Sequence, residues 1–576
     1  MNPSGSEESQ LTQEKSNKSY TYDGVKGWRG YRILRPCRGM YHYIRCRLPY
    51  YATDITDAFT YRTVASIIWM YFVKSLANTR PLMSITYTNI FSLLPALAYT
   101  LDMTRRTGYF YGVNEALFVS ALAAMVFSLL SAQPLTIVGI TGLISLFNYT
   151  IYDIISVYDI ALYPRFMAWT GIWAAIFHWL VAGFNACDNM RYVTDFSSES
   201  FGLEWKSSST SSPTPGTPQG YLSCLIAILY FGSVYGLEKL GASILWKPWF
   251  RGILSDYAYV LTTLFWVGFS HIPGNLQNTD ISQIPTGAPF HPTQPRSWLL
   301  DFWNLEIKWV FVALPFGFLV MLLFYYDHNV SSITAQARQF PLRKPGGFHW
   351  DFFLLGCPTF VSGILGLPLP NGLVPQAPVH TDSLTVYETR VKIIPTVEGE
   401  QTEIRRPVTG ATAVVEQRVA HFVMGLALIE SNGIVQKLIY LSIEKRFIQR
   451  DDPLLSGSRL KTIAYISLQL FGVAITVAIF QSIAAIGFPV LIILLIPLRA
   501  VLMPKWDTLH ELQVLDDLTA SNEVVLASLG GAPVMAEHTR RGIGGWRGGG
   551  ARRGMGCIDR ELEALLVEQQ ALEAWL

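Results

Sequence analysis

The chain has 576 residues, of which 50% are hydrophobic and 15% are charged, and its net charge is +2. This balance excludes an ordinary soluble enzyme of this length and indicates a protein with lipid around much of its surface. The near-neutral charge gives no general attraction to nucleic acid. We find no nucleophile–base pair and no ligand cluster, and the six cysteines form no CxxC pair, so the sequence predicts neither an enzyme nor a metal or cofactor site.

The first 55 residues are predicted to be a cytoplasmic tail that ends in a helical stretch before the first span. Basic residues crowd its second half, at Lys26, Arg29, Arg32, Arg35, Arg38, Arg45 and Arg47. The positive-inside rule places such a segment in the cytoplasm. The polar first residues do not fit a cleavable signal peptide.

Apolar windows then follow along most of the chain. Several approach the length of about 20 residues that a helix needs to cross a bilayer. They comprise residues 116–130, 166–184, 221–237, 257–269, 309–326, 352–369, 462–480 and 483–498. The pattern predicts an all-α polytopic membrane protein. A charged stretch, residues 389–418, reads as a cytoplasmic loop between the later windows.

Two apolar stretches are broken by Gly and Pro: "SAQPLTIVGITGLISLFNYT" (131–150) and "GLPLPNGLVPQAPVHTDSL" (366–384). Each follows a complete apolar window, and one lies in each half of the membrane region. Such paired, interrupted segments indicate an inverted-repeat transporter. Proline stops a helix, and the half-helix that remains points its free N–H groups and positive dipole end into the membrane. Two facing ends would form an anion site; the alternative is two kinked helices without a ligand.

The stretch "FYYDHNVSSITAQ" (324–336) follows an apolar run, 309–326, without any charge. Asp327, His328 and Asn329 arrive there together. They either form the loop that ends the helix or belong to a site inside the membrane. An ionisable group within a membrane segment is costly and points to function.

The motifs "SAQPLTIVGITG", "LPFGFLVMLLFYYDHNVSSITAQ", "KPGGFHWDFFLLG", "LPLPNGLVPQAPVHTDSL" and "FPVLIILLIPLRAVLMP" resemble the bicarbonate-transporter, or anion-exchanger, superfamily, and most closely its fungal and plant borate-transporter branch. The resemblance covers residues 61 to about 518. It implies two inverted repeats of seven segments. A core domain would move against a gate domain that also forms a homodimer.

On this resemblance we divide the chain into a first transmembrane repeat (56–275), an extramembrane loop (276–299), a second repeat (300–504) and a cytoplasmic C-terminal tail (505–576) that is partly disordered. The substrate would lie between the two half-helix ends. The substrate-binding residues implied are Gln133, Leu135, Thr136, Asp327, Asn329, Asn371, Gly372 and Gln376. His349 and Asp351 are expected to be structural.

Two of these positions bear on the substrate. Asp327 falls where the mammalian exchangers have an intramembrane glutamate, and Gln376 falls where the chloride/bicarbonate exchangers carry an arginine. An amide suits a polyhydroxy solute such as boric acid or tetrahydroxyborate better than it suits a small anion. The resemblance therefore implies boron efflux at the plasma membrane, with the vacuolar membrane as the alternative location. A bicarbonate or other inorganic anion exchanger is the alternative function.

Three stretches depart from the family pattern. Residues 73–92 are inserted into the first span, residues 204–220 replace the apolar part of the fifth segment, and near residues 420–422 the eleventh and most of the twelfth segments are missing. A stretch as polar as residues 204–220 cannot be lipid-exposed. We expect errors of splicing or of the gene model, because both flanks of each break match the family. If the chain is real as written, we expect poor membrane insertion and little transport. A non-transporting, truncated paralogue is the further alternative.

Overall fold

The structure is a computed structural model. It describes residues 35–58, 99–100, 103–200, 218–242, 246–247, 250–251, 254, 258–270, 291–337, 346–374, 376–378, 381, 389–395, 401–407, 433–443, 454, 458–480, 483–506, 515–516, 519 and 525. The insertion at 73–92, most of the stretch 204–220, the break near 420–422 and the basic end of the C-terminal tail lie outside these residues. The expectations for those stretches, and for the two repeats of seven segments, stay predictions.

Five described helices are long and apolar enough to cross a membrane. They are α5 (Val113–Leu130), α7 (Tyr163–Gly183), α12 (Ile307–Ala335), α13 (Phe348–Leu365) and α18 (Arg459–Phe480). Each contains most of an apolar window, so the prediction of a helical membrane protein is confirmed. The helix boundaries differ from those of the apolar windows in places. Helix α13 ends before residue 369, where its window ends, because Gly366 adopts a left-handed conformation with φ of 63°.

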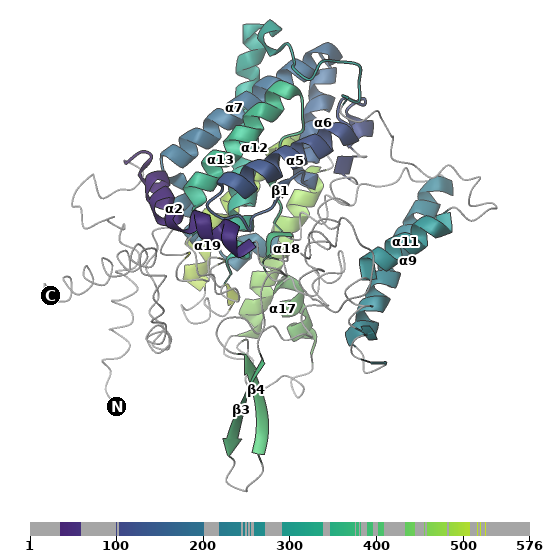
Figure 1. The fold of residues 1–576 in the computed structure, drawn as a ribbon, viewed down its shortest axis with the longest axis vertical. Coiled ribbons are helices and arrows are strands. Elements are labelled where there is room, and N and C mark those ends of the chain that lie inside the picture. Colours follow the sequence, from purple (N-terminus) through teal and green to yellow (C-terminus); the bar gives the residue numbers. More distant parts are fainter. Residues whose placement is uncertain are drawn as a thin grey trace, which may run out of the picture.

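Helices α7, α12 and α13 form the centre of the core, with α7 in contact with the other two (Figure 1). Glycines allow the close approach. A Cβ built on Gly171 of α7 would lie 2.8 Å from Cα of Gly363 on α13, and one built on Gly317 of α12 would lie 2.9 Å from the backbone nitrogen of Ala174. Small residues at helix crossings are the usual way in which membrane helices pack tightly, because lipid supplies no hydrophobic force between them.

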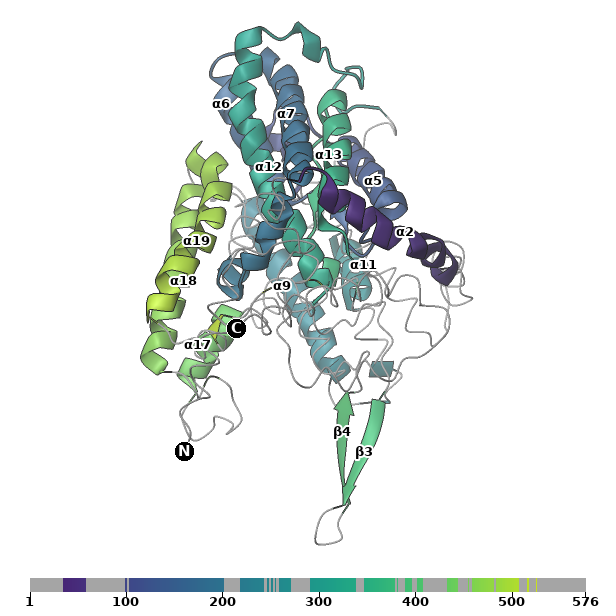
Figure 2. The same ribbon diagram turned by 90° about the vertical axis from the view of Figure 1, so that its left-hand side faces the viewer.

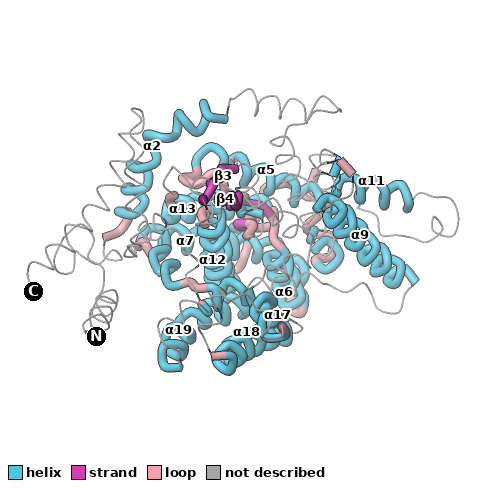
Figure 3. The backbone as a smooth tube through the Cα atoms, turned by 90° about the horizontal axis from the view of Figure 1, so that it is seen from below, coloured by secondary structure: helices cyan, strands magenta, loops and turns pink. Residues whose placement is uncertain are grey.

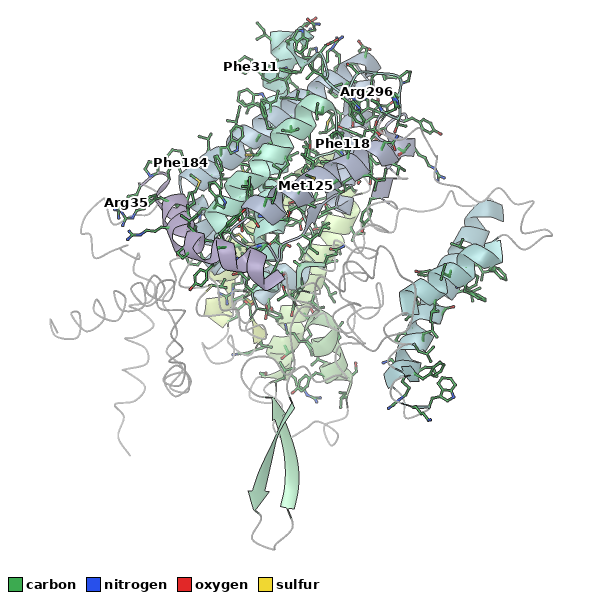
Figure 4. All side chains as sticks on the ribbon, in the orientation of Figure 1. Arg35, Phe118, Met125, Phe184, Arg296 and Phe311 are labelled. Atoms are coloured by element: carbon green, nitrogen blue, oxygen red, sulfur yellow. The ribbon has the colours of Figure 1, made fainter. Side chains whose placement is uncertain are left out.

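The outer faces of these helices carry large apolar side chains. Phe118 and Met125 of α5 are 42% and 63% exposed, and Phe311 of α12 is 62% exposed. Figure 4 shows all three pointing away from the core. A polypeptide in water would bury such residues, so this surface is suited to lipid.

A second group of helices lies beside this core (Figure 2). It contains α17 (Gly433–Ser442), α18, the 3₁₀ turn η9 (Ile483–Gly487) and α19 (Phe488–Trp506). Phe488 and Ile492 of α19 pack into the main core cluster, which joins the two groups. The helices α9 (Pro218–Ala242) and α11 (Ala258–Ser270) pack against each other and stand to one side (Figure 3).

Shorter elements complete the described chain. Helix α2 (Arg38–Ala58) lies at the α13 end where that helix begins, and α6 (Gly142–Ser156) follows the first broken stretch. The turns η4 (Ile160–Leu162), η5 (Ala186–Tyr192) and η6 (Phe302–Asn304) connect helices.

The described residues also contain two short pairs of strands within this mostly helical fold. Strands β1 (Val138–Gly139) and β2 (Asn371–Gly372) pair antiparallel inside the core. Strands β3 (Thr389–Pro395) and β4 (Gln401–Pro407) form a hairpin that projects from the helices in the loop predicted to be cytoplasmic (Figures 1 and 2). Hydropathy windows miss β1 and β2 because two-residue strands carry no periodic signal.

Candidate substrate-binding site

Asp327, His328 and Asn329 lie inside α12, which continues for two further turns to Ala335. All three side chains are at most 1% exposed. Of the two interpretations that the sequence leaves open, the loop at the end of a helix is therefore wrong, and these groups sit within a membrane helix. Burying an acid there has a high desolvation cost unless partners compensate for it.

The two broken stretches meet in the β1–β2 pair. Val138 lies opposite Gly372 and Gly139 opposite Asn371, and the Leu373 N–H donates to the Ile137 carbonyl at 2.9 Å. The strands run antiparallel, and a helical segment begins a few residues after each of them, at Gly142 and near Gln376.

Each stretch becomes helical within a few residues of the pair. Helix α6 begins at Gly142, where the Thr141 hydroxyl accepts from the Ile144 N–H at 3.4 Å. On the other side Ala377 N–H donates to the Leu373 carbonyl at 3.2 Å, which closes a first helical turn around Gln376. Helix N-termini carry unpaired N–H groups and a positive dipole end, so this arrangement can attract an anion without a fixed cation.

Helix α12 holds the second strand through side chains. The Asn371 amide donates to Asp327 Oδ2 at 2.6 Å, and the Ser331 hydroxyl donates to the Leu373 carbonyl at 3.1 Å. His328 packs so closely that a Cβ on Gly372 would lie 2.8 Å from the His328 Cα. Only glycine fits there. Asp327, Asn371 and Gly372, which were all predicted site residues, are thus brought together.

The predicted residues of the first stretch form a turn before β1. The Thr136 N–H donates to the Gln133 carbonyl at 3.2 Å, and the Leu135 N–H donates to Gln133 Oε1 at 3.3 Å. Gln133 therefore uses its side chain to close this turn. The structure gives it no contact with Asp327.

Several buried polar side-chain atoms lack a hydrogen-bond partner among the described residues, and three of them belong to the two broken stretches or to α5 beside them: Ser120 Oγ, Thr136 Oγ1 and Gln376 Oε1. Ser120 lies on α5 beside Gly139, whose built Cβ would be 3.7 Å from the Ser120 hydroxyl. Buried polar groups are nearly always satisfied in folded proteins, so such atoms point to a ligand or water. Sequence reasoning missed Ser120 and Ser331, because neither lies in a broken stretch or beside a charge.

Asn329 does not join this cluster. Its amide donates to the Tyr325 carbonyl at 2.6 Å and lies 4.0 Å from Cys187 Sγ of η5. Two residues along a helix turn the side chain by about 200°, so Asn329 faces away from the strand that Asp327 holds. Within the described residues there is no group of three His, Cys, Asp or Glu side chains that could hold a metal ion.

The chain is similar in sequence to several known proteins. The family model for the HCO3⁻ transporter integral membrane domain matches residues 35–204 and 202–443. A relative named as a transporter in Schizosaccharomyces pombe is 38% identical over 82% of this chain and 94% of its own length. Boron transporter 1 of Saccharomyces cerevisiae is 37% identical over 79% of this chain and 81% of its own.

More distant proteins also match. Anion exchange protein 3 of Pongo abelii is 23% identical over 83% of this chain and 43% of its own length. The transmembrane domain of the cyanobacterial bicarbonate transporter BicA superposes with a TM-score of 0.36 and 14% identity, over 69% of this chain and 96% of that one. A superposition at this level is too weak to support a statement about the fold.

Proposed function

Because the chain belongs to the HCO3⁻ transporter family, we propose that it is a secondary transporter that moves borate or boric acid out of the cell across the plasma membrane. Membership follows from the family model, which covers more than half of the chain, and from a relative that is 38% identical over most of both lengths. It makes the chain an integral membrane protein of a transporter family, in agreement with the apolar helices.

Boron as the substrate is supported first by the relatives. The yeast protein at 37% identity is named a boron transporter, as is an Arabidopsis thaliana protein at 30% identity over 54% of this chain. The mammalian anion exchange protein is less similar, at 23%.

The observation that carries the proposal is the set of hydrogen-bond acceptors at the strand pair. Gln376 Oε1 has no partner among the described residues, and the Asp327 carboxyl lies buried with Asn371 as its donor. Boric acid and tetrahydroxyborate present several O–H donors to such acceptors, whereas chloride presents none and bicarbonate presents one. A carboxylate would also repel a small anion that cannot donate to it.

The helix N-termini complete this chemistry. Their N–H groups and dipoles can stabilise negative charge on a borate oxygen, while Asp327 and Gln376 accept from its hydroxyl groups. The Thr136 hydroxyl can donate a hydrogen bond to a borate oxygen or accept one from a borate hydroxyl group. Movement of the α12–α13 core past α18 and α19, within a homodimer, would then expose the site to each side in turn, as is common in inverted-repeat transporters.

Boron efflux from yeast that lacks its own boron exporter tests this proposal. Cells that express the chain with its three departures corrected to the family pattern should lose preloaded boron several-fold faster than cells that carry an empty vector, with chloride-36 exchange unchanged. Chloride or bicarbonate exchange without boron efflux would instead assign the alternative, an inorganic anion exchanger.

A second candidate, a non-transporting paralogue, rests on the three departures from the family pattern. The two blocks of the family match meet at residues 202–204, where we expect the fifth segment to be lost. Sequencing of the transcript tests the explanation by a splicing or gene-model error. A transcript that encodes this chain as written would overturn that explanation, and absence of all transport by such a chain would favour the paralogue.

A further inference from the structure

We propose that Asp351 is a positioning residue for transport, which fixes the turn before β1, and that Arg47 of α2 supplies its counter-charge. The helix before the first span would then be a working part of the carrier. This inference rests on the proposed transport function. The sequence alone assigned Asp351 only a structural role.

Asp351 lies in the first turn of α13 and is completely buried. Its two carboxyl oxygens accept from two consecutive backbone N–H groups: Oδ1 from Ala132 at 2.6 Å and Oδ2 from Gln133 at 3.0 Å. Hydrogen bonds to a charged acceptor are about twice as strong as neutral ones, and a two-point attachment also fixes orientation. The carboxylate therefore sets both the place and the direction of this turn.

The turn leads straight into the candidate site. Gln133 bonds to the N–H groups of Leu135 and Thr136, and Ile137 accepts from Leu373 of the second stretch. Val138 and Gly139 then pair with the strand whose Asn371 holds Asp327. A displacement at Ala132 and Gln133 would thus move Thr136 and β1 relative to the acceptors on the other side.

Arg47 is 7% exposed and lies four residues after Tyr43, on the face of α2 that packs on His349 at the start of α13. It reaches this position because α2 packs against the start of α13. The other ionisable groups that face this end are Cys187, Asp188 and His349; Asp188 Oδ1 lies 3.0 Å from His349 Nε2. A buried carboxylate needs a cation or several donors to stay charged. Asp351 has two backbone donors, and we assign Arg47 as the cation.

Helix α2 and the residue before it are held against the end of α7 and the start of α13 by particular contacts. The Cys37 N–H donates to the Gly183 carbonyl at 2.7 Å, and the Gly39 N–H donates to Asn185 Oδ1 at 2.9 Å. A Cβ on Gly39 would lie 2.5 Å from the His349 ring, so only glycine allows this approach. Tyr43 packs on the same ring, with centroids 5.5 Å apart. The arrangement fixes the face of α2 that carries Tyr43 and Arg47 against the start of α13.

Asp351→Asn tests the positioning role. Asparagine keeps the size but offers one acceptor oxygen and places an NH2 group against a backbone donor. We expect the KM for boron to rise roughly tenfold, with a smaller change in the maximal rate per molecule at the cell surface. The control is Glu306→Gln, an exposed carboxylate beside Lys308, which should leave both parameters unchanged. An unchanged KM in Asp351→Asn would overturn the proposal.

Arg47→Gln and the double variant test the counter-charge. Arg47→Gln should raise the KM several-fold. In the Asp351→Asn background it should raise the KM by less than about twofold more, because the effects of two groups that act through one interaction do not add. If the KM of the double variant equalled the product of the two separate increases, Arg47 would not be the counter-charge of Asp351.

A labelling experiment separates this inference from the transport function. In a cysteine-free background, Gln133→Cys keeps the backbone N–H that Asp351 holds, and its side chain should react slowly with a thiol reagent in permeabilised cells. Adding Asp351→Asn should speed labelling roughly tenfold, while adding Glu306→Gln should not. Faster labelling would support the positioning role, and absence of boron efflux from the chain without these substitutions would separately refute the proposed function. Equal labelling would contradict the positioning role.

Discussion

The two broken stretches, residues 131–150 and 366–384, meet at one strand pair but are held there by different means. A carboxylate on α13 accepts from the backbone of the first stretch, at Ala132 and Gln133. Side chains of α12 hold the second, through Asp327 and Ser331. The second stretch is also tighter: a Cβ on Gly372 would lie 2.8 Å from a backbone atom, against 3.5 Å to the nearest side-chain atom for Gly139.

The two stretches therefore have different parts in the proposed site. The second stretch and α12 supply side-chain acceptors, Gln376 and Asp327, while the first supplies a helix N-terminus that Thr141 caps. A site built in this way can separate recognition of hydroxyl groups from stabilisation of charge. Changes on the α12 side should therefore affect transport more than matching changes on the α6 side.

The largest effect is expected for Asp327→Ala, which removes the acid and leaves Asn371 without its acceptor. Loss of a hydrogen bond to a charged group costs about 1.5–3 kcal/mol, which corresponds to roughly 10- to 150-fold. Boron efflux should fall by that factor at equal surface abundance. Asp301→Ala, at an exposed acid before the same helix, is the control. A rate within twofold of wild type in Asp327→Ala would remove this residue from the site.

Glycine substitutions test the asymmetry most directly. Gly372→Ala forces a methyl group against the His328 backbone, and overpacking of this kind costs about 1–3 kcal/mol. We expect roughly tenfold less efflux. Gly139→Ala on the paired strand meets only ordinary contacts and should change efflux less than twofold. Equal losses in the two variants would show that the strands are equally constrained.

Gln376→Arg should change the selectivity of the site. The substitution replaces an unpartnered acceptor by a cation with donors only, so one hydrogen bond to a substrate hydroxyl is lost, at about 0.5–1.5 kcal/mol. Boron efflux should fall about two- to tenfold, and chloride-36 exchange should appear or rise. The control is Gln294→Arg, at a partly exposed loop position outside the proposed site. Boron efflux at the wild-type rate would argue against a role of Gln376 in binding.

The smallest effect is expected for Ser331→Ala, which removes one neutral hydrogen bond to the Leu373 carbonyl while the other contacts of the second stretch remain. A loss of about twofold in efflux is the lower end for such a bond. Thr334→Ala, one turn away and bonded within its own helix, should have no effect on efflux and serves as the control. A tenfold loss in Ser331→Ala would place the hydroxyl in direct contact with substrate.

Much of this architecture could be predicted from the sequence. The apolar windows gave the membrane helices to within a few residues, and the Gly and Pro positions in 131–150 and 366–384 gave the two breaks. The start of α13 at Phe348 and the extension of α12 past Asp327 could not be predicted from hydropathy, because polar residues continue both helices where partners satisfy them. Asn329 was grouped with Asp327 by sequence proximity, although the helical turn separates them.

The sequence by itself determined that this chain is a helical membrane protein with two interrupted segments and an acid in an apolar helix. Those features follow from the cost of moving each residue from water to lipid, which depends on local composition. Only the tertiary structure decided which groups meet: the β1–β2 register, the Asp327–Asn371 bond and the two N–H groups on Asp351, which lie 218 and 219 residues away in the chain. Such pairings depend on how whole helices pack, and no local pattern encodes them.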